Sequence, residues 1–320
     1  EDSAGEGLND QTPVNPIDGN KATTLGQQRL AVLQLAADVI ETIFDFNVDI
    51  KIGVNFAPDE NGFLATASSE TWEYSDSSFY LPFSNTQYPQ ALGNQFYGYD
   101  RVSNNNDISV NINSSRTDYY LGFDSSPPYS NQYSLLGVML HEIIHGLGFL
   151  HGLNASTGDF HSFPLIFDRY LQEKSLSLMW PSMTSWQRYN SIKGGDLYWA
   201  GSNVITESQW LQNELDSWQY SGHTVSGHVE MYAPSSFKSG SSGSHFDENV
   251  IPHELMEHAK SSEDPNHHIG MAKQVLQDIG WPVFNNGDKP LLTAISSGSI
   301  LSNEIYQTSF VIFDNDNAYH

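Results

Sequence analysis

The sequence contains no cysteine among its 320 residues. This absence excludes disulfide bridges, thiolate metal sites and cysteine nucleophiles. Basic residues are also few, because 13 Lys and Arg stand against 38 Asp and Glu and give a formal net charge of −25. Nucleic acids and anionic membrane surfaces are both recognised through clustered Lys and Arg. The composition therefore argues against both partners, and the strong negative charge leads us to expect a monomer.

The sequence also lacks any apolar run that approaches the length of a membrane span, so we expect no membrane insertion. Its most apolar stretch, residues 135–150, carries His141, Glu142 and His145 in its middle, which predicts a buried helix with polar inserts. The hydrophobic fraction of 38% is enough for a globular core. Because the chain begins at Glu1 without a signal-like segment, we interpret it as a processed form.

Periodicity along the chain divides it into four regions. Residues 1–23 are polar and rich in Pro and Gly, which predicts an extended leader. Residues 24–151 are expected to form a first lobe and residues 152–283 an irregular second lobe, followed by a tail of β-rich composition at residues 284–320. Apolar spacing predicts helices at 25–44, 134–147 and 269–279 and strands at 48–54 and 108–112, with Thr23 or Thr24 as the first cap. This order of elements indicates an α+β fold.

The segment His141-Glu142-Ile143-Ile144-His145 places two imidazoles four residues apart. On a helix these positions share one face, so both side chains can reach a single ion. Burying two histidines and a glutamate in an apolar helix without a partner would cost several kcal/mol. Zinc held by neutral histidines keeps an open coordination position and lowers the pKa of its water towards neutrality. The motif therefore predicts a zinc site, with Glu142 as the base that takes a proton from water.

The longer string from His141 to His151 resembles the metzincin zinc peptidases, because it satisfies H-E-x-x-H-x-x-G-x-x-H at every fixed position. The resemblance implies a zincin-like catalytic domain whose two lobes flank the metal helix. In the general pattern Gly148 would end the helix and His151 would be the third ligand. A Met-containing turn also lies beneath the metal in that family, and residues 252–256 (Pro-His-Glu-Leu-Met) provide a candidate.

Residues 244–256 resemble the leishmanolysin branch of the metzincins and its secreted bacterial relatives. In that branch the third ligand is a distant His eleven residues before the Met, and His245 has this spacing to Met256. Three other segments carry the resemblance, at residues 24–30, 107–109 and 277–281, so that it covers roughly residues 24–283. The resemblance implies a secreted, extracellular protein. The chain departs from leishmanolysin itself in lacking cysteine, so no disulfide framework carries over.

The sequence thus offers two candidates for the third ligand. His151 has the general metzincin spacing, whereas His245 has the spacing of the leishmanolysin branch and would link two distant features. We favour His245 and keep His151 as its rival. Met256 is expected to support the imidazoles from below, since a thioether is a poor zinc ligand beside nitrogen donors. His258 stands where some metzincins have a transition-state tyrosine, although a supporting or surface role suits it better.

These residues predict a zinc-dependent endopeptidase that acts on protein or peptide substrates. No nucleophile elbow, phosphate-binding glycine loop or dinucleotide-binding fingerprint is present. The strand at 108–112 is expected to be an edge that pairs with an extended substrate. The alternative is a zinc-stabilised binding or adhesion module without turnover, and the presence of Glu142 speaks against it.

The tail contains two further predicted strands, at residues 291–295 and 310–313. They could begin an appended domain or form a hairpin docked on the catalytic lobe. Residues 314–317 (Asp-Asn-Asp-Asn) offer oxygen ligands that Ca²⁺ could use, but they lack the rest of a calcium-loop pattern, which favours a solvated turn.

Overall fold

A mixed five-stranded sheet forms the base of the molecule. The computed structural model describes residues 2, 5–75, 80–124, 131–215, 219–259, 267–284, 310–314 and 317–318. The sheet contains β1 (Ile50–Ala57), β2 (Ala65–Ser69), β5 (Ile108–Asn113), β12 (Phe310–Asp314) and β13 (Asn317–Ala318), in the order β13-β12-β1-β5-β2. Strand β1 runs parallel to β5 and β12, whereas β2 runs antiparallel to β5. Strand β2 therefore lies at one edge of the sheet.

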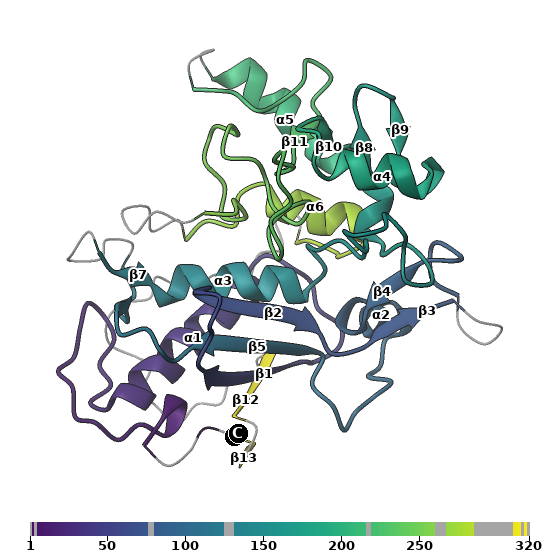
Figure 1. The fold of residues 1–320 in the computed structure, drawn as a ribbon. Helices are drawn as coiled ribbons and strands as arrows, with labels where there is room; N and C mark the ends of the chain where they lie inside the picture. Colours follow the sequence, from purple (N-terminus) through teal and green to yellow (C-terminus); the bar gives the residue numbers. More distant parts are fainter. Residues whose placement is uncertain are drawn as a thin grey trace.

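Two helices pack next to this sheet and determine where the site lies. Helix α1 (Leu25–Glu41) begins after Thr24, whose side chain accepts a hydrogen bond from the backbone of Gln27, as expected of an N-cap. Helix α3 (Leu135–Gly146) is capped by Ser134 in the same way, and all 12 of its residues are buried. Figure 1 shows α3 between the sheet and the second lobe. Because α3 is buried on every side, other elements must pack against all of its faces.

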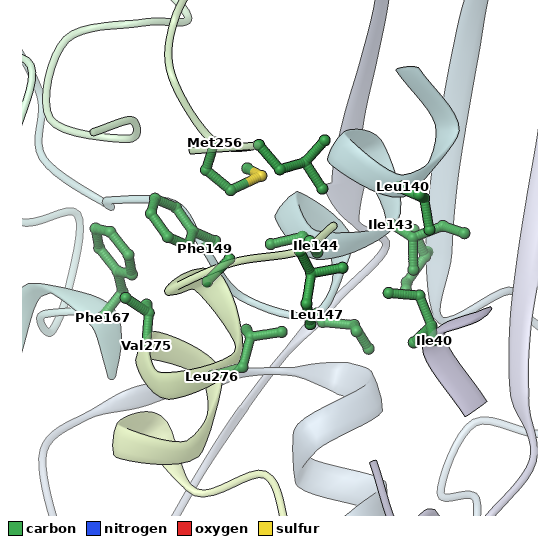
Figure 2. Packing of buried hydrophobic residues seen from close by; sticks show 14 of the residues in the cluster. Ile40, Leu140, Ile143, Ile144, Leu147, Phe149, Phe167, Met256, Val275 and Leu276 are labelled. Carbon is green, nitrogen blue, oxygen red and sulfur yellow. The ribbon is translucent and has the colours of Figure 1, made fainter. Parts of the chain in front are cut away.

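The core continues from one lobe to the other through α3. Figure 2 shows side chains of α3, such as Leu140 and Ile144, between Ile40 of α1 and a group from the second lobe that includes Met256 and Leu276. All five of these residues are buried in one hydrophobic cluster. The helix that carries the histidines is therefore fixed by apolar contacts on two sides.

Shorter elements complete the first lobe. Strands β3 (Trp72–Tyr74) and β4 (Gln87–Pro89) pair antiparallel and lead into α2 (Gln90–Tyr97). Strands β6 (Tyr119–Tyr120) and β7 (Tyr133–Ser134) pair in parallel just before α3, and a 3-10 turn, η1, spans Gly7–Asn9. Residues 13–24 are joined by two β-bridges, Pro13 with Thr24 and Ile17 with Asn20.

The second lobe is built on a four-stranded sheet in the order β11-β10-β8-β9. Its strands are β8 (Leu171–Glu173), β9 (Leu178–Met179), β10 (Leu197–Trp199) and β11 (Val229–Glu230). Around it lie α4 (Ser185–Ser191), α5 (Ser202–Glu214), α6 (Ala272–Ile279) and the 3-10 turns η2 (Phe167–Tyr170) and η3 (Trp180–Ser182). The large side chains of Trp180, Trp199 and Trp281 are fully buried, so this lobe has a substantial aromatic core.

The α+β class is confirmed, and helices lie close to all three predicted positions, at α1, α3 and α6. The expectation that residues 108–112 form a sheet edge was wrong. Strand β5 is hydrogen-bonded to β1 on one side and to β2 on the other, so its backbone groups are already used. The predicted strand at 310–313 is confirmed as β12, which joins the sheet beside β1, whereas residues 291–295 lie outside the described residues. Among the helices that the structure describes, none is long and apolar enough to span a bilayer.

Asp278 of α6 joins three elements of the second lobe. Its buried carboxylate accepts hydrogen bonds from the indole N–H of Trp199 at 2.9 Å and from the backbone N–H of Asn203 at 2.7 Å. It also accepts from the side chain of Asn203 and the backbone of Val204, in the first turn of α5. Helix α5 has no side-chain cap of its own at Gly201, so Asp278 supplies one from another helix.

We predict that Asp278→Ala lowers the free energy of unfolding by about 2–4 kcal/mol, because it leaves buried donors unpaired and removes a helix cap. Urea unfolding followed by circular dichroism measures this change. Glu60→Ala, at an exposed loop position, is the control and should shift stability by less than about 0.5 kcal/mol. A comparably small effect for Asp278→Ala would contradict the assigned role.

Candidate metal centre

Helix α3 provides the first two imidazoles of the site. His141 and His145 lie one helical turn apart, and each is 9% exposed. After His145 the chain leaves the helix at Gly148, whose φ of +122° is a backbone conformation that residues other than glycine rarely adopt. This turn brings the backbone of Phe149 back beside the His145 ring.

The third imidazole comes from a distant loop. His245 lies between β11 and α6 and is 5% exposed. Its loop is hydrogen-bonded on both sides: the backbone N–H of Tyr232 donates to the carbonyl of His245, and that of Phe246 donates to the carbonyl of Met256. The second lobe therefore carries His245 on a backbone that is tied to the turn at Met256.

The three Nε2 atoms meet at one point. The distance is 3.0 Å between His141 and His145, 3.1 Å between His141 and His245, and 3.2 Å between His145 and His245. Nitrogen ligands at the usual zinc distance in a tetrahedral site lie about 3.3 Å apart. The spacing of the three nitrogens thus fits one first-row metal ion, and these buried histidines form a group that could bind it.

The other nitrogen of each ring faces a backbone carbonyl. His141 Nδ1 lies 2.9 Å from the carbonyl oxygen of Leu255, His145 Nδ1 lies 2.6 Å from that of Phe149, and His245 Nδ1 lies 3.0 Å from that of Ser241. A carbonyl can only accept, so each Nδ1 must carry the proton. All three Nε2 atoms are then unprotonated, so none of them can donate a hydrogen bond to another. A cation between them would relieve the repulsion of their lone pairs, and such carbonyl partners are typical of metal-bound histidines.

Burial keeps two of the three rings, those of His145 and His245, neutral. Burial lowers the pKa of His145 to about 4 and lowers that of His245 well below its ordinary value, and the His145 charge lowers the latter further. Neutral imidazole is the form that binds a metal. The site is therefore ready for a cation at neutral pH without first losing a proton from either ring.

Glu142 follows His141 on α3 and is 6% exposed. Burial raises the pKa of Tyr119, and the charges of Asp118 and Glu142 raise it further, so the phenol lies within electrostatic reach of Glu142. The Tyr119 hydroxyl donates to the carbonyl of Leu64, immediately before β2. This hydrogen bond connects the neighbourhood of Glu142 to the start of the edge strand.

The predicted turn around Met256 also lies against the site. Met256 is fully buried, and Figure 2 shows it near Phe149 and Ile144. The residue before it, Leu255, provides the carbonyl that fixes His141. His258 is stacked on Tyr232 with ring centroids 3.6 Å apart, and burial lowers its pKa.

His151 is not part of the three-histidine group. Its Nδ1 accepts a hydrogen bond from the backbone N–H of Leu153 at 3.0 Å, and its ring lies edge-on to Trp180. Burial lowers the pKa of His151 to about 4, so the ring is neutral. Of the two candidates for the third ligand, the structure brings His245 to the pair on α3 and leaves His151 hydrogen-bonded to backbone.

Sequence reasoning missed the groups that orient the imidazoles. They are the backbone carbonyls of Leu255, Phe149 and Ser241, and any residue type can supply a carbonyl. The sequence could have indicated these carbonyls only through their distance from recognised residues. Phe149 comes four residues after His145, and Ser241 comes four residues before His245. Leu255 directly precedes Met256.

Comparison with known protein families places the chain in one of them. The SPBPB7E8-like family matches residues 17–199, which is more than half of the chain, and the protein belongs to this family. The matched region includes His141, Glu142 and His145, whereas His245 and Met256 lie beyond it. No curated protein matches the chain.

We predict that zinc stabilises the protein through the three imidazoles. At about 100 times its dissociation constant, zinc should raise the free energy of unfolding by about 2.7 kcal/mol. His245→Ala should abolish this metal-dependent gain, whereas the exposed control His161→Ala should keep it. Thermal unfolding with zinc and with a chelator measures the effect, and an equal gain in wild type and His245→Ala would place the metal elsewhere.

Proposed function

We propose that this protein is a zinc-dependent endopeptidase of the metzincin type, similar to the leishmanolysin branch. The observation that carries the proposal is the convergence of three unprotonated Nε2 atoms, each oriented by a carbonyl on the other side of its ring, next to a buried glutamate. A structural zinc site has four protein ligands, whereas a catalytic one has three and keeps a position open. Three imidazoles and an adjacent carboxylate fit the second type.

Zinc held by three imidazoles would polarise a substrate carbonyl and lower the pKa of a water molecule towards neutrality. Glu142 is the residue that would accept the proton from that water. It would then deliver the same proton to the leaving amine, so that it acts first as a base and then as an acid. His141 and His145 flank Glu142 on α3, and the rigid packing of this helix would hold the three side chains in place.

The edge strand β2 is the element that suits an extended peptide. Residues Ala65–Ser69 pair with β5 on one side, and within the described residues no strand pairs with the other side. An exposed strand edge binds extended peptides through backbone hydrogen bonds. Tyr119 anchors the start of this strand and lies within electrostatic reach of Glu142. We therefore assign to β2 the role that the sequence had suggested for residues 108–112.

The net charge of −25 favours neutral or basic substrates by simple attraction. Secretion and the monomeric state stay predictions from the sequence, and so does the preference for a solvated turn over a calcium site in residues 314–317.

We predict that Glu142→Gln retains zinc but lowers peptide hydrolysis by about 10²–10⁴-fold, because the amide cannot accept the proton. The measurement is cleavage of a denatured protein or a fluorogenic peptide library, with metal content determined on the same samples. Glu173→Gln is a matched control, since Glu173 is also a buried glutamate but lies in β8, where Ser175 is its partner.

Glu173→Gln should hydrolyse peptides at the wild-type rate, and a chelator should abolish hydrolysis by both proteins. If zinc-loaded wild type cleaves no peptide, the proposal fails and a zinc-stabilised binding module becomes the better account. If Glu142→Gln cleaves as fast as wild type, the base has been assigned to the wrong residue.

A further inference from the structure

His151 occupies the position of a third ligand in the general metzincin pattern, yet its ring makes a different set of contacts. Its Nδ1 accepts from the backbone N–H of Leu153, so the ring is held by the chain that directly follows it. Burial lowers the pKa of His151 and the backbone of Ser242 raises it in part, so that backbone lies beside the ring. A neutral imidazole has one donor and one acceptor, and because Nδ1 is the acceptor here, Nε2 carries the proton.

Ser242 belongs to the loop that carries His245. The backbone N–H of His151 also donates to the side-chain oxygen of Ser244, at 3.1 Å. His151 thus contacts the loop on both sides of Gly243. That glycine has a φ of +78°, and a Cβ placed on it would lie 3.0 Å from Cδ2 of the His151 ring. The imidazole therefore packs directly against the loop backbone.

The same loop fixes the orientation of the His245 ring. The carbonyl of Ser241 accepts from His245 Nδ1, and Ser241 directly precedes Ser242. The far side of the loop is bonded to the strand segment after β11, because the N–H of Gly243 donates to the carbonyl of Tyr232 at 2.7 Å. The loop is therefore held from two sides, by Tyr232 and by His151.

The support behind His151 is rigid. Its ring lies edge-on to Trp180, with centroids 5.9 Å apart, and Trp180 is fully buried. The indole N–H of Trp180 donates to Ser191 at the end of α4. Movement of His151 away from the loop would therefore require rearrangement of the aromatic core of the second lobe.

We propose that His151 is a positioning residue, which holds the Ser241–His245 loop so that His245 Nε2 faces His141 and His145. This inference rests on the metal site of the proposed function. It assigns to His151 a role in metal affinity without direct coordination. Residues that orient a ligand in this way typically contribute 10–100-fold to metal affinity.

The test uses His151→Phe, which keeps a ring against Trp180 but removes the hydrogen bond from Leu153 and the polar edge that faces the loop. Co²⁺ is the probe, because it reports affinity through chelator competition and ligand geometry through its visible spectrum. We expect the dissociation constant to rise 10–100-fold and the cobalt bands to change. His223→Ala is the control, since His223 is a half-buried histidine bonded to Ser208, and it should leave both readouts unchanged.

If His151→Phe binds Co²⁺ with the affinity and spectrum of wild type, the inference is overturned while the metal site stands. If wild type itself binds no metal, the proposed function fails first, so the two failures are distinguishable. Should the variant not fold, ¹⁵N NMR of the wild-type histidine rings decides. A positioning role predicts that His151 keeps a protonated Nε2 and an unprotonated Nδ1 before and after zinc is added. A metal-dependent shift of a His151 nitrogen, like that of the ligands, would contradict it.

Discussion

Everything proposed for this protein depends on three imidazole nitrogens that are held together against their mutual repulsion. Their Nε2 atoms lie 3.0–3.2 Å apart, and their Nδ1 protons are committed to three backbone carbonyls. The three lone pairs repel one another, whereas a divalent cation placed between them would be attracted by all three. The fold supplies the opposing force, because His141 and His145 lie on a helix that is buried along its whole length.

That constraint explains why the two lobes need each other. The first lobe brings a pair of histidines and Glu142 on α3, and the second brings His245 together with Leu255, whose carbonyl orients His141. Apolar contacts between α3 and residues such as Met256 and Leu276 join the lobes at this place. Burial of apolar side chains between the lobes thus stabilises a site in which His145 and His245 lie 100 residues apart in the chain. The metal would add its own binding free energy to this interface.

The local elements of the fold could be predicted where pattern and chemistry agree. Helix α3 follows from its apolar run and the Ser134 cap, and α1 from its spacing and Thr24. Helix α5 could not be predicted, because only Val204 and Ser208 are buried in it and its cap comes from Asp278 far along the chain. Strand β5 was predicted to be an edge strand. Apolar alternation shows which side chains share a face of a strand, but it does not show which strands pair with it. Pairing with β1 and β2 is a long-range property that periodicity does not contain.

The candidate site shows the same division. The spacing of His141 and His145 requires only a helix, so the sequence was sufficient to predict that this pair shares one face. The choice between His151 and His245 depended on whether a distant loop folds back against α3, which the sequence does not determine.

The central claim is that one metal ion is bound by three imidazoles here. X-ray absorption spectroscopy at the zinc edge tests it most directly on zinc-loaded protein. The account predicts three imidazole nitrogens and one further light atom at about 2.0–2.1 Å. A shell of oxygen atoms without imidazole scattering would contradict it.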